Sequence, residues 1–396
     1  MKKVKGILIL LTVALAFTVF IAQSQAREEF KLGITLPLSG PGSSYGIPTL
    51  HSIEMAVEEI NEKGGVTVAG KQYDFKLVVY DDKCTPTEGL NVLEKLISRD
   101  RVKVILGPVC SGNISALAPK IGDRVIILTV GTVVSDYTQI GNPNIFRPHV
   151  SVQSVSGDMT NFLINDLGIR TVGICAGKSS WSTELLPVYK ERFPKAGGKV
   201  WAEWVDLGSK DLYPTLTSLW SHKPDAIGHF GYPPQAALTF KQIHELGFTP
   251  KHRFSISSGG AADFLRVTSA DILEGIYDLM AASIESRIEA GNKRAAEFKK
   301  TFMERYKIEP LWGAGCNGYD VVYIVKHGLE NAGSVTDLVK IRTGLQSIGE
   351  VPEAINDYPA VNGRIWNEKN EAYFQGAARE FHNGEFRLIR FLGAFK

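Results

Sequence analysis

Short apolar runs alternate with amphipathic helical patterns along most of this 396-residue chain. The runs are too short for helices and are rich in β-branched residues, whereas the segments between them place apolar residues at helical spacing. This alternation is typical of a doubly wound sheet of parallel strands with helices between them. The runs lie at 30–36, 73–80, 102–106 and 125–130 and, where the alternation restarts, at 171–176, 200–205, 226–230, 253–257 and 276–282.

These two series of strands predict an α/β protein with two similar lobes built on parallel sheets. The crossovers between them are short and no flexible linker joins them, so we expect a hinge and a cleft between the strand ends. Near the end of the chain, residues 363–392 alternate polar and apolar side chains around residues 367–370. That pattern predicts a closing antiparallel hairpin with its turn at 367–370.

One junction between a strand and a helix is suited to binding an anion. The strand at 102–106 ends at Gly107-Pro108, and Cys110-Ser111-Gly112 leads into a helical pattern. The free N–H groups and the dipole at the start of a helix favour negative charge, and ligands of open α/β sheets bind at the carboxyl ends of strands. We therefore expect Ser111 at the mouth of a ligand cleft, although an ordinary capping serine would give the same pattern.

The first 26 residues differ in character from the rest of the chain. Three lysines precede an apolar run over residues 6–22, and Ser24-Gln25-Ala26 offers a small-residue cleavage site. We predict a secretory signal peptide cleaved after Ala26; an N-terminal membrane anchor is the alternative. There is no cysteine near the cleavage site for a lipid anchor, and no later segment has the roughly 20 apolar residues of a membrane span.

Export would leave a nearly neutral chain. The 44 basic residues would fall to 41, against 42 acidic residues, so the net charge would become −1. Nothing in this balance favours nucleic acid or an anionic membrane as a partner. The eight histidines form no metal-binding motif, and we expect neither a metal nor another cofactor. We expect a monomer.

The four cysteines form no CxxC pair, which excludes the common zinc and redox motifs. Cys84 follows the predicted strand at 73–80, and Cys110 follows the next strand along the chain. Because neighbouring parallel strands end at the same edge of a sheet, and because export permits disulfides, we predict a Cys84–Cys110 bridge. We expect Cys175 and Cys316 to be buried free thiols.

Several motifs resemble catalytic sequences without the context that catalysis needs. Residues 42–46 match GxSxG, but Ser44 lies eight residues after the strand it should follow directly, so a serine hydrolase is disfavoured. Residues 173–179 are one residue short of a phosphate loop. His229, at a predicted strand end, could face the cleft, but we favour a structural histidine. No set of nucleophile, base and orienting acid emerges, and we expect a protein that is not an enzyme.

Several stretches of the first predicted lobe together resemble the periplasmic solute-binding proteins of branched-chain-amino-acid-type ABC importers. The resemblance extends over essentially the whole chain after residue 26. It rests on Gly33–Gly40, Tyr45-Gly46, Ala56–Asn61 with Gly64-Gly65, Tyr80–Asp82, Cys84 and Gly107–Ser111. It implies a type I periplasmic-binding fold, in which two Rossmann-like lobes are joined by a three-strand hinge. It also implies a periplasmic location, an inner-membrane ABC permease as partner, and again the Cys84–Cys110 disulfide.

The resemblance also implies lobe boundaries and a ligand site. We expect the first lobe at 27–147 plus 281–358 and the second at 148–280 plus 359–396. In such proteins the ligand carboxylate is held by the serine after the second cysteine and by a turn that ends the next strand, while aromatic residues of the second lobe cover the ligand. The matching residues are Ser111, then Gly131, Thr132 and Val133, and then Trp181 and Tyr232, with Tyr45 and Ser258 as further candidates.

One departure from the family bears on the ligand. Amino-acid binders usually place an acidic residue near the end of a second-lobe strand to pair with the ammonium group, but residues 255–260 hold none before Asp263. Burying an unpaired ammonium is costly, and Trp181, Tyr232 and Tyr45 could stack on a ring. We therefore favour a benzoate- or cinnamate-type acid, with a hydrophobic amino acid or amide as the alternative. A ligand sensor that serves a signalling partner would share these features.

Overall fold

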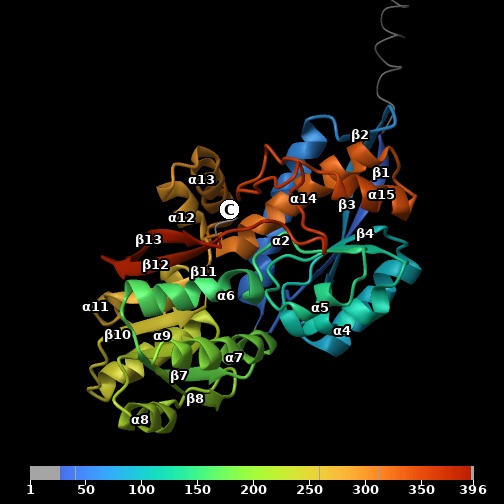
Figure 1. Ribbon diagram of the computed structural model, residues 1–396. Helices are drawn as coiled ribbons and strands as arrows, with labels where there is room; N and C mark the ends of the chain where they lie inside the picture. The colour runs from blue at the N-terminus through green and yellow to red at the C-terminus, as the bar shows by residue number, and fades with distance from the viewer. Residues whose placement is uncertain (1–26, 41, 258, 311, 394–396) are drawn as a thin grey trace, which may run out of the picture.

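A computed structural model describes residues 27–40, 42–257, 259–310 and 312–393, without the side chains of 312–315. The predicted signal peptide therefore lies outside the described residues. The chain forms two α/β lobes, each built on its own sheet, which lie beside one another in Figure 1. Among the helices that the structure describes, none is long and apolar enough to cross a bilayer.

Six strands form the sheet of the first lobe, in the order β2-β3-β1-β4-β5-β6. All neighbouring pairs are parallel except β2 with β3. Strands β4 and β5, which follow β1 in this order, are wholly buried and apolar, as expected for interior strands covered on both faces. The strands are β1 (Glu28–Leu36), β2 (Val66–Val68), β3 (Lys71–Asp81), β4 (Val104–Leu106), β5 (Ile126–Leu128) and β6 (Ile145–Phe146).

The helices of the first lobe pack in two groups, α2 with α14 and α15, and α3 with α4. Helix α2 approaches the loop after β1 so closely that a Cβ at Gly46 would lie 1.9 Å from the carbonyl oxygen of Pro37. Glycine is therefore required there, and it brings the first turn of α2 to the end of β1. The helices are α2 (Ser43–Glu62), α3 (Pro86–Glu94), η1 (Lys95–Arg99), α4 (Ser111–Ile121), α5 (Asp136–Gln139), α14 (Trp312–Ala332) and α15 (Leu338–Gln346).

Seven strands form the sheet of the second lobe, in the order β13-β12-β11-β10-β9-β7-β8. The five strands from β7 to β11 run parallel, and the last two add an antiparallel edge. The strands are β7 (Thr171–Gly177), β8 (Lys199–Val205), β9 (Ala226–Phe230), β10 (His252–Ile256), β11 (Ile276–Ala281), β12 (Gly376–His382) and β13 (Glu385–Leu392).

Between these strands the chain forms helices of very different lengths. The capping box Ser151–Ser154 starts α6, and side-chain caps also start α7, α12 and α13. The helices are α6 (Val152–Asn161), η2 (Phe162–Asp166), α7 (Ser180–Lys195), α8 (Tyr213–Ser221), α9 (Pro233–Glu245), α10 (Ala261–Leu265) and α11 (Ala270–Leu273). After β11 follow α12 (Ile284–Glu289) and α13 (Lys293–Tyr306), and α13 packs on the first lobe, where Arg305 pairs with Glu58 of α2.

The chain passes between the lobes three times, after β6, after β11 and before β12, so the predicted two-lobe fold with three crossovers is confirmed. The segment 361–372, which we expected in the second lobe, hydrogen-bonds instead with the first. The backbone N–H of Ile365 donates to Ile348, and that of Ala372 donates to Arg147. We therefore propose that the first lobe extends to about residue 374.

The predicted turn of the C-terminal hairpin was wrong. The hairpin of β12 and β13 turns at Asn383-Gly384, where both residues have positive φ, as a two-residue turn of this kind requires. Residues 367–370 do form a turn, but it closes only an isolated bridge between Trp366 and Ala372. Polar turn residues occur both at 367–370 and at 383–384. The second turn is the turn of the hairpin because the strand before it, β12, pairs with β11 and extends the sheet.

The Cys84–Cys110 disulfide is confirmed, with Cα atoms 5.5 Å apart, and Cys175 and Cys316 are buried and free. The reason we gave for the bridge was incomplete, because β1 lies between β3 and β4. The loop after β3 crosses the end of β1 to reach Cys110. Asp82 holds that loop: its backbone N–H donates to Leu36, and its carboxylate accepts from the Thr35 hydroxyl and from the N–H of Cys84.

Candidate ligand-binding site

A cavity lies between the lobes at the carboxyl ends of the parallel strands, where open α/β sheets bind ligands. Its empty space, including solvent at its open side, is about 530 Å³. Both lobes contribute to its wall. The lining residues are Gly42, Tyr45, Val109, Cys110, Ser111, Gly131, Val133, Trp181, Tyr232, Ile256, Ser257 and Met280.

The first lobe presents the start of α4 to the cavity. Ser111 is the first residue of this 11-residue helix, and the disulfide-bonded Cys110 precedes it in an extended conformation. Gly107 makes the approach possible: its φ is +110°, and a Cβ there would lie 2.0 Å from the carbonyl oxygen of Thr35. The strand-to-helix junction therefore places a serine hydroxyl and the positive end of a helix at the cavity wall.

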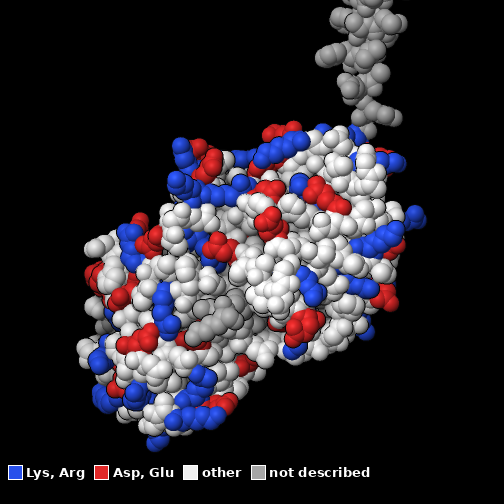
Figure 2. Space-filling view, turned by 45° about the horizontal axis from the view of Figure 1, so that its top comes forward, with Lys and Arg blue, Asp and Glu red and all other residues white. Residues whose placement is uncertain are grey.

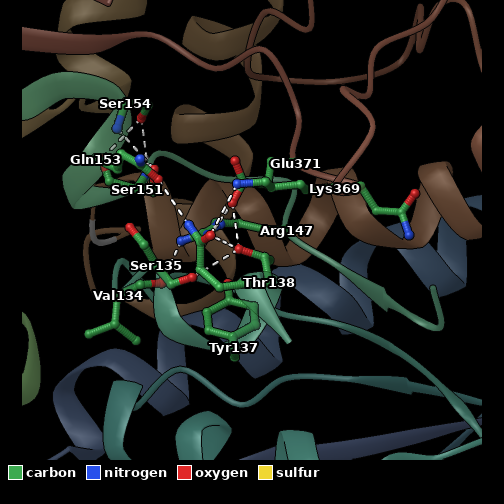
Figure 3. A network of polar contacts seen from close by, with 12 residues as sticks. Val134, Ser135, Tyr137, Thr138, Arg147, Ser151, Gln153, Ser154, Lys369 and Glu371 are labelled. Atoms are coloured by element: carbon green, nitrogen blue, oxygen red, sulfur yellow. Dashed lines mark hydrogen bonds and ion pairs between the residues drawn. The ribbon is translucent and has the colours of Figure 1, made fainter. Parts of the chain in front are cut away.

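The turn after β5 forms the neighbouring part of the wall, and a buried polar network supports it (Figure 3). Arg147 is fully buried and donates to the carbonyl oxygen of Val134 at 2.5 Å, to the Thr138 hydroxyl at 2.5 Å, and to Glu371. Its guanidinium also lies 4.7 Å from the ring centroid of Tyr137. The network ties the wall to the first crossover and to the segment 361–372.

The second lobe contributes aromatic side chains. Trp181 lies in the first turn of α7, which Ser179 caps, and its side chain is 7% exposed. Tyr232 is the N-cap residue of α9, directly after β9. Its ring centroid lies 5.6 Å from that of Tyr45 on α2 of the other lobe. The two lobes thus meet through aromatic rings at the cavity.

The described lining of the cavity contains no Asp, Glu, Lys or Arg side chain. Burial raises the pKa of Tyr45 well above its usual value and also raises that of Tyr232, so both phenols stay protonated at neutral pH. A protonated phenol can donate a hydrogen bond to a carboxylate. The polar side chains of the described wall are therefore neutral, and the start of α4 adds the positive end of a helix dipole to them.

A wider groove continues from the cavity toward solvent and shares Cys110, Ser111, Trp181 and Tyr232 with it. Lys178 lines the groove and pairs with Asp206 at 2.7 Å. On the face shown in Figure 2, basic and acidic residues are interspersed over the surface. The groove provides a way in for a small ligand, and nothing on this face gathers the single-sign charge that a nucleic acid would need.

The sequence profile of the family described as periplasmic binding protein matches residues 29–372. The chain belongs to that family. A leucine-, isoleucine-, valine-, threonine- and alanine-binding protein of Pseudomonas aeruginosa is 26% identical over 353 residues, which cover 88% of this chain and 90% of the relative. The resemblance noted in the sequence is thereby confirmed, and the relatives of this periplasmic binding protein are named as binding proteins.

Solved structures show the same fold. A leucine-binding protein from Thermotoga maritima superposes with a TM-score of 0.78 at 24% identity, covering 92% of this chain and 98% of the other. An ABC-transporter solute-binding protein from R. palustris, in complex with benzoate, superposes with a TM-score of 0.76 at 18% identity, covering 92% and 96%. At these identities the likeness establishes the type I periplasmic binding fold. The ligands named for these proteins belong to two different classes.

The structure of this periplasmic binding protein brings six of the predicted site residues to one cavity: Tyr45, Ser111, Gly131, Val133, Trp181 and Tyr232. Thr132 does not line it. Its buried hydroxyl, which we expected beside the ligand carboxylate, lies 2.8 Å from that of Tyr137. Ser258 lies outside the described residues.

Sequence reasoning missed Gly42, Val109, Ile256, Ser257 and Met280. Ser257 was the nearest to being found, since it is the last residue of the predicted strand at 253–257 and precedes a residue that we did choose. Met280 lies within β11 and carried no local signal.

The disfavoured catalytic motifs lie in unsuitable structures. Ser44 is exposed in the first turn of helix α2 rather than in a turn after a strand. The sequence resembling a phosphate loop runs through strand β7. His229 is buried, with Nδ1 2.9 Å from the Thr239 hydroxyl, which fits a structural histidine. Within the described residues no group of His, Cys, Asp and Glu is arranged to hold a metal ion.

Proposed function

We propose that this chain is the ligand-capture component of an ABC importer and that it carries an aromatic carboxylate to an inner-membrane permease. The observation that carries the proposal is the composition of the cavity wall. It combines a serine at a helix start with three aromatic side chains, and its described residues include no acidic group. The lobes would close on the ligand and shift the population toward the state that the permease binds.

In this proposal each part of the wall has a separate role. The first turn of α4, with Ser111, holds the carboxylate, since it supplies N–H groups, a hydroxyl and the positive end of a helix dipole. Trp181, Tyr232 and Tyr45 enclose the ring, where aromatic contacts add to the burial of apolar surface. The benzoate complex of a protein with the same fold supports this ligand class.

A hydrophobic amino acid is the second candidate, because the P. aeruginosa relative is named for leucine, isoleucine and valine. An amino acid would bring an ammonium group into a cavity with no described acidic lining residue. A buried ammonium needs a charged partner or it costs several kcal/mol. The cost of burying an unpaired ammonium group favours the aromatic acid over an amino acid.

The test is binding to refolded protein freed of any ligand carried through purification. Benzoate, cinnamate, benzamide, leucine and isoleucine are compared by thermal shift and calorimetry. A ligand at 100 times its dissociation constant stabilises by about 2.7 kcal/mol, a visible rise in Tm. We expect the two aromatic acids to bind, and benzamide, which lacks the charge, to bind at least tenfold more weakly. Binding of leucine without either aromatic acid would refute the proposal.

A matched pair of variants tests the carboxylate subsite. Ser111→Ala should weaken benzoate binding at least fivefold, since a hydrogen bond to a charged group is lost. Ser115→Ala is the control, because its hydroxyl lies one turn further along α4 and bonds to the carbonyl oxygen of Ser111, outside the cavity. Equal losses in the two variants would place the carboxylate elsewhere.

A further inference from the structure

Ser257 contributes a polar side chain to the second-lobe wall of the cavity. It directly follows β10, is 7% exposed, and lines the cavity together with Ile256 and Met280. Ser111 lies on the wall of the other lobe. A ligand that spans the cavity with its carboxylate at Ser111 would therefore bring its other end toward Ser257.

The hydroxyl of Ser257 has a fixed direction because of Asp278. The Ser257 Oγ lies 2.8 Å from Asp278 Oδ1, and the Ser257 backbone N–H also approaches this oxygen, at 3.3 Å. The Ser255 hydroxyl donates to the same oxygen at 2.5 Å. An ionised carboxylate can only accept, so Ser257 donates its proton to Asp278, which is nearer than its other acceptor, the Ser255 hydroxyl at 3.4 Å. Its oxygen lone pairs then remain to accept a hydrogen bond from the ligand.

The charge of Asp278 is balanced on its other side. Asp278 on β11 and Arg379 on β12 are directly paired across the sheet, and Arg379 donates to Asp278 Oδ2 at 2.5 Å and to the carbonyl oxygen of Gly259 at 2.9 Å. Both side chains are buried. Arg379 and Asp278 form a buried ion pair, and such a pair carries no net charge. Ser257 thus offers the ligand a hydrogen-bond acceptor without offering it a counter-ion.

We propose that Ser257 is a specificity-determining residue that accepts a hydrogen bond from a neutral donor at the end of the ligand away from its carboxylate. The chain would then select hydroxylated aromatic acids over unsubstituted ones, and a phenol over an ammonium. This inference rests on the proposed function and narrows its ligand class.

The experiment measures dissociation constants by calorimetry for benzoate, 3-hydroxybenzoate, 4-hydroxybenzoate and their fluoro analogues. Wild type should bind one hydroxybenzoate about tenfold more tightly than benzoate, the range expected for one buried hydrogen bond. The fluoro analogues, similar in size but without a donor, should bind like benzoate. In Ser257→Ala the preference for the hydroxyl should fall to less than twofold.

Ser255→Ala is the matched control, because Ser255 donates to the same carboxylate but does not line the cavity. It should keep the full hydroxyl preference. Should Ser257→Ala fail to fold, Ser257→Gly removes the same hydroxyl. No preference in wild type, or an equal preference in the Ser257 variants, overturns the inference while the proposed function stands. Failure of every benzoate to bind overturns both.

Discussion

The Glu184 carboxylate, on helix α7 of the second lobe, accepts a hydrogen bond from the backbone N–H of Ser135 in the first lobe, at 2.8 Å. Ser135 follows the turn that lines the cavity, and α7 begins beside Trp181. The bond therefore joins the lobes next to the cavity. It is an interaction that the protein makes when the lobes are together and loses when they separate.

Removing this contact should weaken ligand binding by favouring open lobes. We expect Glu184→Ala to raise the dissociation constant about three- to tenfold, mainly through faster dissociation, since a partly exposed hydrogen bond to a charged group is lost. Stopped-flow binding measures the dissociation rate, and small-angle scattering measures whether the lobes are open. Glu191→Ala is the control, because Glu191 is on the same helix and pairs with Lys195 at the surface. Equal dissociation rates in both variants would show that the bond does not hold the lobes together.

Trp181 should contribute strongly to affinity. Its side chain is buried at the cavity wall, so Trp181→Ala should weaken binding of the preferred acid at least tenfold through lost ring contact. Trp204 lines only the outer groove and is 41% exposed, and Trp204→Ala should change affinity less than threefold. Calorimetry on both variants measures the two dissociation constants. An unchanged affinity in Trp181→Ala would remove this residue from the site.

The number of reactive thiols should differ among the native, the unfolded and the unfolded, reduced protein. Burial raises the pKa of Cys175 to about 12 and that of Cys316 well above its usual value, so the native protein should show no thiol reactive toward a disulfide reagent. Unfolding without reductant should expose two thiols, and reduction should raise the count to four. Four thiols before reduction would contradict the Cys84–Cys110 bridge.

The free energy of unfolding should fall in acid through His229. Burial lowers the pKa of His229 to about 3, below the usual 6.5, so between these values the unfolded chain binds a proton that the folded chain does not. Stability is thus retained above pH 6.5 and declines as the pH falls toward 3, by up to about 1.4 kcal/mol per pH unit for this group.

Urea unfolding at pH 7 and pH 5 tests this dependence. His229→Gln, which does not titrate, should reduce the difference in stability between the two pH values. Thr239→Val removes the hydroxyl partner but keeps the histidine, and should retain the wild-type difference. The same pH dependence in His229→Gln and wild type would assign the acid sensitivity to other groups, such as the buried His149.

The sequence predicted the features that depend on local pattern. The strand, Gly107 and the helix that begins at Ser111 are consecutive in the chain, and so are the residues that place Trp181 and Tyr232 at strand ends. Strand alternation was likewise enough to predict the two lobes and the parallel strands of their sheets, although both sheets also contain antiparallel pairs. Residues that lie at a strand end or a helix start beside the cavity could therefore be predicted from the sequence.

Features that depend on distant pairing were not predictable in this way. Asp278 and Arg379 are 101 residues apart and meet because β12 pairs with β11, and no local motif marks either residue. Thr132 was misjudged because a hydroxyl beside a cavity can turn inward to a partner such as Tyr137, and sequence does not show which way it turns. The hairpin was misplaced because two turn sequences competed and only one had a sheet edge to extend.

The three crossovers also govern when this chain can finish folding. The first lobe needs α14 and α15, which follow the whole parallel part of the second lobe, and the second sheet receives β12 and β13 from residues 376–392. A ribosome-bound chain that lacks its final quarter therefore has two incomplete cores. Such a chain would stay incompletely folded until its synthesis is nearly complete. An incompletely folded chain is the form that can pass through a narrow export channel.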